Sequence, residues 1–163
     1  MKTAVVYYSY DGNCALVAEQ IKAQIDADIL RLVPVNEKRR SGFFAIFCGV
    51  LQVFMGKKPD LKPYSFDPEA YEIIILGTPV WAGRPTPAMH SFLSKTKISG
   101  KKLALFICHR GGKGDAMNKF KALLDNNTIV SEIDFFEPAR KNPEEQKQQI
   151  KDWAKNIAGL STK

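Results

Sequence analysis

Three short segments of the chain combine residues that could bind an anion or a planar ligand. The first is Ser9-Tyr10-Asp11-Gly12-Asn13-Cys14, which follows an apolar run. A glycine permits a tight turn there, and backbone amides at the start of the next helix attract an anion, with Ser and Asn side chains as further donors. The segment lacks the Gly-Lys-Ser/Thr of a Walker A loop and the repeated glycines of a dinucleotide fingerprint. It predicts either a phosphate-type anion site or an ordinary strand-to-helix turn with Asn13 as the N-cap.

The second segment is Gly77-Thr78-Pro79-Val80-Trp81-Ala82-Gly83-Arg84-Pro85-Thr86-Pro87, which three prolines stiffen. Trp81 offers a flat apolar face on which a planar ring can stack. Gly77 and Gly83 let the backbone approach a ligand closely. A lone Trp can also seal the end of a core, but the neighbouring Thr-Pro and Gly residues favour the ligand interpretation.

The third segment is Cys108-His109-Arg110-Gly111-Gly112-Lys113-Gly114. It supplies flexible backbone, an imidazole and two cations, although glycine-rich loops commonly do no more than turn the chain. His109 is a candidate to donate a hydrogen bond or a proton to a ligand, because imidazole changes charge near neutral pH. The sequence contains no Cys-x-x-Cys and no His-Glu-x-x-His, so it predicts no metal site.

Hydrophobic periodicity indicates the elements that must position these segments. Apolar runs predict strands over 2–8, 28–33, 71–77, 102–108 and 128–135, and helical spacing predicts helices that include 17–25, 86–95, 113–124 and 143–160. Strands that alternate with helices form right-handed crossovers and a parallel sheet covered on both faces. The sequence therefore predicts an α/β fold with a doubly wound, five-stranded parallel sheet in three layers. Ligands bind such sheets outside the carboxyl ends of the strands.

Together the three segments resemble the flavodoxin family over nearly the whole chain, and Gly-Thr-Pro-Val-Trp-Ala-Gly is the most specific match. The resemblance implies the strand order 2-1-3-4-5 and FMN as the cofactor. It implies that the first segment holds the phosphate of FMN, with Ser9, Gly12 and Asn13 foremost, and that the other two enclose the isoalloxazine ring. The residues so assigned to FMN binding are Ser9, Tyr10, Asp11, Gly12, Asn13, Cys14, Thr78, Pro79, Val80, Trp81, Ala82, Gly83, Cys108, His109 and Gly111.

Two residues of the first segment depart from the family pattern Ser/Thr-x-Thr-Gly-Asn-Thr: Asp11 and Cys14 stand in place of threonines. A hydrogen bond to a charged group contributes about 1.5–3 kcal/mol, so losing two hydroxyl donors would weaken FMN binding by about one to a few orders of magnitude. An inward Asp11 would add repulsion of the phosphate, and an outward one would not. Cys14 is either a reactive thiol at a helix start or a small apolar residue, and we favour the second. Cys48 and Cys108 are expected to be inert.

Composition and charge set wider limits. The chain has 163 residues, 45% of them hydrophobic, which predicts a single domain over 1–163. Three Cys, an odd number, and an N-terminus without an apolar signal core favour the cytoplasm. The formal net charge is +7, and six basic residues against two acidic ones lie in an insertion at about 36–63.

Within that insertion, residues 43–55 are apolar on every side. They are too few to span a bilayer, which takes about 20 residues. We expect a helix buried against the sheet. The alternative is a surface that docks on a partner, on a second copy of the chain or on an anionic membrane, because the flanks are basic.

These observations favour an FMN-binding electron carrier. Its partners would be redox proteins with acidic surfaces, because a basic chain is steered toward acidic ones. One alternative is an FMN-dependent NAD(P)H or quinone reductase, with Arg84, Arg110 and Lys113 near the nucleotide. Another is a binding module that lost tight flavin binding. Nucleic-acid binding is not expected, because no recognition motif is present. A response-regulator receiver is set aside, because Ser9 and Gly77 stand where it needs acidic residues.

Overall fold

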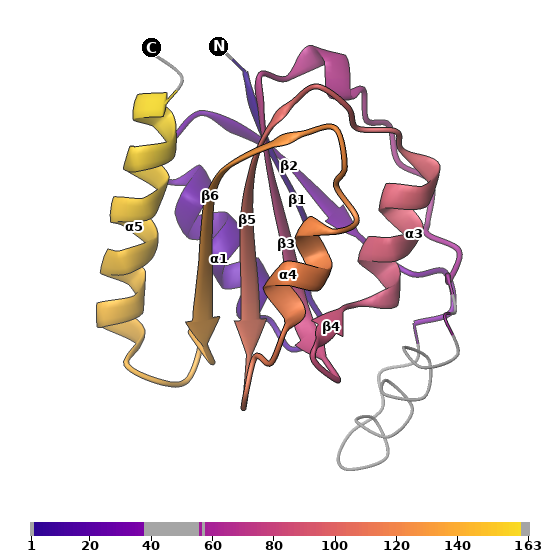
Figure 1. Cartoon of the computed structure of the whole chain (residues 1–163). Helices are drawn as coiled ribbons and strands as arrows, with labels where there is room; N and C mark the ends of the chain where they lie inside the picture. Colours follow the sequence, from indigo (N-terminus) through magenta and orange to yellow (C-terminus); the bar gives the residue numbers. More distant parts are fainter. Residues whose placement is uncertain (1, 38–55, 57, 161–163) are drawn as a thin grey trace.

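The computed structural model describes residues 2–37, 56 and 58–160. Its sheet has five parallel strands in the order β2-β1-β3-β5-β6, with a short strand β4 antiparallel to β3 (Figure 1). The strands are β1 Thr3–Tyr8, β2 Ala27–Leu32, β3 Ile73–Trp81, β4 Arg84–Pro85, β5 Lys102–His109 and β6 Thr128–Phe136. The predicted fold class and the predicted order of the parallel strands are therefore confirmed, the fourth and fifth of them being β5 and β6.

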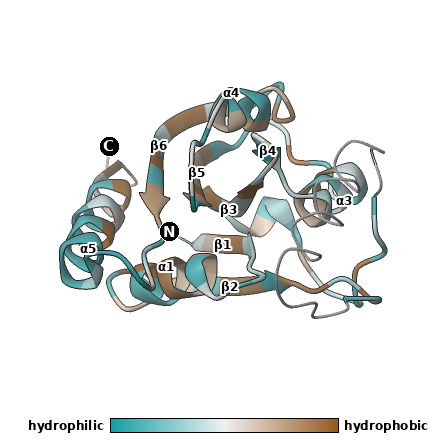
Figure 2. Cartoon of the chain, turned by 90° about the horizontal axis from the view of Figure 1, so that it is seen from below, coloured by the Kyte–Doolittle hydropathy of each residue, from teal (hydrophilic) through white to brown (hydrophobic). Residues whose placement is uncertain are grey.

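Helices cover both faces of the sheet. They are α1 Asn13–Lys22, α3 Pro87–Lys95, α4 Ala116–Lys121 and α5 Pro143–Leu160, with a 3-10 turn η1 at Pro68–Ala70. One buried cluster joins the sheet to α1 and α5, and a second joins it to α3 and α4. Figure 2 shows the consequence: the strands are mostly brown, and the exposed side of α5 is mostly teal. Central strands buried on both faces explain why they read as continuous apolar runs.

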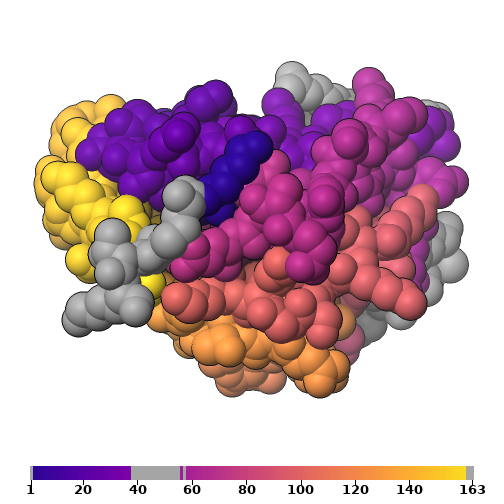
Figure 3. Space-filling view, turned by 90° about the horizontal axis from the view of Figure 1, so that it is seen from above, coloured from indigo at the N-terminus to yellow at the C-terminus, as the bar shows by residue number. Residues whose placement is uncertain are grey.

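The carboxyl ends of the parallel strands point to one end of the molecule, the lower end in Figure 1. At the opposite end, seen from above in Figure 3, residues from the magenta and coral parts of the chain lie at the centre and cover the amino ends of the strands. Loops that follow β1, β3 and β5 therefore share the lower end, where doubly wound sheets bind ligands.

The strand β3 is longer than its apolar run predicts. It continues past Gly77 to Trp81, and then returns as β4 through a two-residue turn. Residues Thr78 and Pro79 still pair with β5 opposite Ile107 and Cys108. Much of the second predicted loop is therefore a β-hairpin.

Helix α4 is shorter than the predicted 113–124 and begins at Ala116. The reason is local: Gly114 has a φ of 52°, in the left-handed region, and glycines are poor helix formers. Helix α1 ends at Lys22, so Ile25 packs on the core from beyond the helix.

The two ends of the basic insertion lie side by side. Pro34 bridges Leu61 in antiparallel fashion, the amide of Val35 donates to the carbonyl of Asp60 at 2.8 Å, and that of Lys62 donates to Val33 at 2.7 Å. Leu61 is buried in the cluster beneath α3. The apolar stretch 43–55, including Cys48, lies outside the described residues. Among the residues described, no helix is both long enough and apolar enough to cross a membrane.

Candidate functional site

The loops after β1, β3 and β5 all lie at the carboxyl end of the sheet, the lower end in Figure 1. Arg110 of the third loop places its Nε 3.4 Å from Asp11 Oδ2 of the first. A Cβ on Gly114 would lie 3.7 Å from the Cα of Gly83 at the hairpin tip. The ring of Tyr10 packs on that of Trp81. The three segments singled out by sequence therefore form one surface.

The first loop turns into α1 through Gly12, whose φ of 92° is left-handed. Gly12, rather than Asn13, is the N-cap. Side chains of the loop itself take up amides of the first helical turn: Asp11 Oδ1 accepts from the Asn13 amide at 3.2 Å, and Ser9 Oγ accepts from the Ala15 amide at 3.1 Å. The carboxylate of Asp11 therefore lies at the N-terminus of α1 and accepts a hydrogen bond from its first turn.

Asn13 is buried, with an exposed fraction of 4%, and both ends of its amide are hydrogen-bonded. Its Nδ2 donates to Asp11 Oδ2 at 2.9 Å. Its Oδ1 accepts from the amide of Ala139 at 3.0 Å. Asn13 thus ties the first loop to the segment that follows β6.

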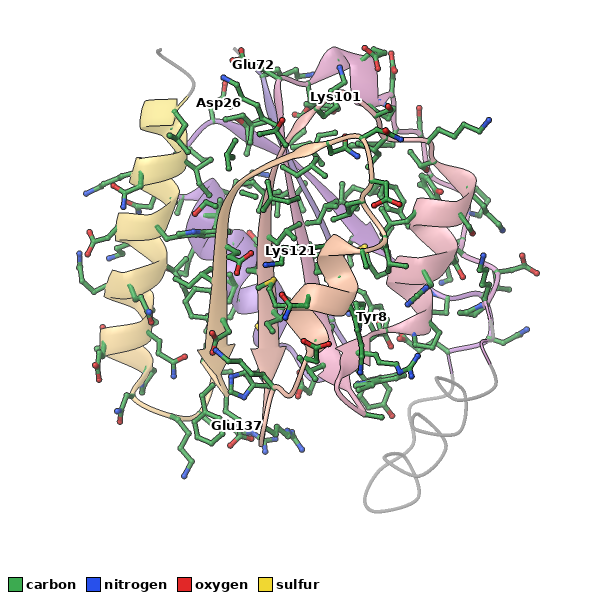
Figure 4. All side chains as sticks on the ribbon, in the orientation of Figure 1. Tyr8, Asp26, Glu72, Lys101, Lys121 and Glu137 are labelled. Carbon is green, nitrogen blue, oxygen red and sulfur yellow. The ribbon has the colours of Figure 1, made fainter. Side chains whose placement is uncertain are left out.

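That segment is a fourth part of the site, which sequence reasoning missed. The amide of Glu137, at the lower end of Figure 4, donates to the carbonyl of His109 at 3.0 Å. Glu137 Oε1 lies 3.3 Å from Arg110 Nε, and Arg140 lies 4.0 Å from the same oxygen. Arg110 is therefore shared between Asp11 and Glu137. The available signal was an acidic residue two positions after the predicted strand 128–135, at the edge where the other loops meet.

The hairpin tip has an unusual backbone. Ala82 and Gly83 have φ angles of 50° and 65°, the two successive positive values of a type I′ turn. Trp81 pairs with Arg84 across the turn, so the amides of the two central residues take no part in the strand ladder. Alanine in the left-handed region costs about 1–2 kcal/mol. Such strain is concentrated at functional positions.

Trp81 is half-buried between two tyrosines. Its ring meets Tyr8 edge-on at 6.0 Å between centroids and Tyr10 at 5.9 Å. Burial raises the pKa of Tyr8, whose hydroxyl donates to Glu37 Oε1 at 2.7 Å. The sequence pointed to Trp81 and Tyr10 but not to Tyr8, which is labelled in Figure 4 and packs on the same Trp81 ring.

The residues at the base of the hairpin, Gly77 to Pro79, pack inside the protein. A Cβ on Gly77 would lie 1.9 Å from Phe106 Cζ, so this glycine makes room for a core ring and not for a ligand. Thr78 is buried, and its hydroxyl bonds to the Thr86 hydroxyl at 2.9 Å. Pro79 is buried too, whereas Val80, Trp81, Ala82 and Gly83 are partly or fully exposed.

The third loop is fastened to β6 by Asp134. His109 Nε2 lies 3.1 Å from Asp134 Oδ2, and Lys113 Nζ lies 2.6 Å from Oδ1. His109 Nδ1 faces the carbonyl of Gly111 at 2.6 Å. Both nitrogens of His109 are thus engaged within the protein.

Partial burial raises the pKa of Asp134, but the hydrogen bonds from Lys113 and His109 outweigh it, so the pKa is lowered overall.

Cys14 and Cys108 are buried thiols without a disulfide. Burial raises the pKa of Cys14 well above its usual range, and the neighbouring Cys108 thiol raises it further. This supports the interpretation of Cys14 as a small apolar residue.

The cations near the site differ in their pairing. Arg110 and Lys113 are ion-paired, whereas Arg84 at the hairpin is exposed and has no ion pair with any residue that the structure describes. Desolvation lowers the pKa of His90, and the charges of Lys58 and Arg84 lower it further. Arg84 and Lys58 are therefore both close enough to His90 to disfavour its charged form. No cluster of three or more metal-binding side chains occurs in the described part of the chain.

No family model matches the sequence, and no curated protein is significantly similar to it. Solved structures do match. A flavoprotein in complex with FMN from Lactobacillus acidophilus NCFM has a TM-score of 0.72 at 20% identity, over 87% of this chain and 97% of that one. Oxidised flavodoxin 2 from Bacillus cereus has 0.63 at 19%, over 98% and 99%. Azoreductase from Bacillus anthracis str. Sterne has 0.56 at 12%, over 97% and 99%. At these identities the chain shares the flavodoxin-like fold.

Proposed function

We propose that this protein binds FMN at the carboxyl ends of β1, β3 and β5 and carries electrons between partner proteins. The observation that carries the proposal is the convergence of the loops around Trp81, beside a strained turn, at the point where the strand order reverses between β1 and β3. A similar fold holds FMN in the L. acidophilus flavoprotein.

The ring part of FMN suits the residues present. Trp81 and Tyr10 supply partly exposed aromatic surface. The backbone amides of Ala82 and Gly83 take no part in the β3–β4 hydrogen bonding, so they can donate to the edge of the flavin ring. In the third loop, the contact between the His109 ring and the Gly111 carbonyl fixes the loop beside the hairpin. FMN, when bound, supplies the electron-accepting ring, and the protein's part is to orient it and exclude water.

The first test is a titration of the full-length purified chain with FMN, followed by quenching of flavin fluorescence. We expect saturable quenching, and a Trp81→Ala variant should bind at least about tenfold more weakly, because it loses stacking area. Trp153→Phe is the matched control, because Trp153 lies on α5 with its indole donating to Ser131. Absence of binding below millimolar FMN would reject the proposal and favour a non-redox binding module.

A reductase is the second candidate, and the exposed Arg84 favours it, because a nucleotide phosphate could pair with this cation. The discriminating assay is NAD(P)H oxidation with a quinone acceptor and saturating FMN. A carrier shows no turnover above free FMN. Turnover that Arg84→Ala lowers, mainly through KM for NADPH, would replace the carrier proposal with the reductase.

The physiological setting is part of the same proposal. The net charge of +7 suits redox partners with acidic surfaces, and so does the exposed Arg84, which forms no ion pair with a described residue. The cytoplasm suits a chain whose Cys14 and Cys108 are free thiols.

A further inference from the structure

The phosphate part of FMN suits this site less well than the ring part. We propose that Asp11 is a specificity-determining residue that takes the place of the flavin phosphate, so that this protein binds riboflavin about as tightly as FMN. The proposal rests on flavin binding at this site, as proposed above.

The first argument concerns donors. The side chains that the first loop offers a phosphate are those of Ser9 and Asn13. Ser9 Oγ accepts from the Ala15 amide and keeps its own hydrogen to donate. The Asn13 side chain is divided between Asp11 and Ala139, and the Asn13 backbone amide also donates to Asp11. A phosphate would have to displace the Asn13 bonds to Asp11 before it gained its own from Asn13, so the net contribution of Asn13 to phosphate binding is small.

The second argument concerns charge. A helix start attracts one anion, and here the Asp11 carboxylate lies within hydrogen-bonding distance of the first turn. A phosphate placed beside it would meet a like charge. Arg110 contacts Asp11 but also pairs with Glu137, so its charge is shared by two carboxylates already. Among the described residues, the ion pair of Arg140 is with Glu137 Oε1, at 4.0 Å, and Arg31 donates to the Ser9 carbonyl at 3.3 Å.

The third argument concerns rigidity. Asp11 is held by Asn13 and Arg110, and Asn13 is itself buried and fixed to the segment after β6. Turning Asp11 outward would break two hydrogen bonds from Asn13 and leave a buried amide donor without its partner. Such an unsatisfied group costs about 1–3 kcal/mol. The inward carboxylate is therefore the favoured arrangement.

The test compares FMN with riboflavin, by fluorescence quenching, in the parent, Asp11→Thr and Asp11→Asn. We expect a ratio of the two affinities near one in the parent. Asp11→Thr should raise the ratio about tenfold or more by tightening FMN alone, because it adds a hydroxyl donor and removes a charge. Asp11→Asn removes the charge but keeps an oxygen that accepts from Asn13, so a smaller rise is expected.

Asp152→Asn, on the exposed side of α5, is the control for a change of net charge, and it should leave the ratio unchanged. Unchanged riboflavin affinity in the Asp11 variants shows that they fold. A parent that prefers FMN by about a hundredfold, or a ratio that Asp11→Thr does not raise, would overturn this inference while leaving flavin binding in place. If neither flavin binds to the parent or to any of the variants, the proposed function is rejected instead.

Discussion

Gly77 shows how one absent side chain permits the packing beneath the site. A Cβ there would lie 1.9–2.5 Å from three carbons of the Phe106 ring, and Phe106 is fully buried in the centre of the sheet. Gly77→Ala should therefore lower the free energy of unfolding by about 1–3 kcal/mol through overpacking. Urea denaturation of the apoprotein measures it.

Gly111→Ala is the matched control, because nothing lies within 4 Å of a Cβ at that position. It should change stability by less than about 0.5 kcal/mol. Equal stability of the two variants would mean that Phe106 moves aside freely, and the packing argument would fail.

Cys14 leads to a second prediction for a single residue. It is fully buried, and burial raises the pKa of its thiol. In native protein at pH 8, iodoacetamide should label Cys14 at least about a hundredfold more slowly than in urea-unfolded protein, because the reactive thiolate is both rare and shielded. Mass spectrometry of the Cys14 peptide reads this out separately from the other cysteines. Rapid labelling of the folded chain would restore the reactive-thiol interpretation.

Residue types and spacing were enough to find Trp81 and the three loops, because apolar runs place those loops after strands. They could not give the orientation of Asp11. The direction of the Asp11 side chain depends on Arg110, which lies 99 residues later in the sequence. It also depends on Asn13, whose side-chain amide is held by Ala139, 126 residues later. Side-chain directions set by such distant partners leave no periodic signal.

At the level of elements, the third loop depends on β6 for its position. Asp134 binds Lys113 and His109, and these bonds lower its pKa although partial burial opposes them. A carboxylate whose folded-state pKa is lowered stabilises the fold above its ordinary range near 3.8. That stability is lost as the pH falls through the lowered folded-state pKa. Asp134→Asn should therefore destabilise the protein at pH 7 but make little difference near pH 2.

The expected difference at pH 7 is no more than about 1 kcal/mol, because Asp134 is a third exposed and solvent screens the pair. Urea unfolding of the parent and the variant at several pH values measures it. Asp152→Asn serves as the exposed control on α5. A difference between parent and Asp134→Asn that persists at pH 2 would show that packing of the side chain, and not its charge, holds the loop.

Long periodic elements were predictable and short ones were not. The spacing of Ile150, Trp153 and Ile157 gave α5 over 143–160, as observed. The hairpin was missed because prolines normally interrupt strands. Pro79 nonetheless pairs with Cys108 at the end of the parallel ladder, and Pro85 lies in β4 at the hairpin's edge. The short α4 was overextended because its apolar spacing continues beyond the helix.

For the whole molecule, the sequence gives a net charge of +7 but not the places where that charge is unpaired. Lys2, Lys95, Lys101 and Lys121 are all in ion pairs away from the hairpin. Arg84 forms no ion pair within the part of the chain that the structure covers. Its charge and that of Lys58 both act on His90. Arg84 therefore places a positive charge on the hairpin that carries Trp81, where electrons would enter or leave.

The charge of Arg84 predicts how electron transfer depends on salt. With FMN bound and reduced, oxidation by ferricyanide, a small anion, should slow as ionic strength rises, because added salt screens the attraction of the anion to Arg84 and Lys58. Arg84→Glu should lower the rate at low salt several-fold and flatten the salt dependence. Lys155→Glu changes the net charge equally but lies on the exposed side of α5, so it should leave the low-salt rate close to that of the parent. Stopped-flow measurements of the three proteins separate local from overall charge, and equal effects of the two variants would show that net charge alone steers the acceptor.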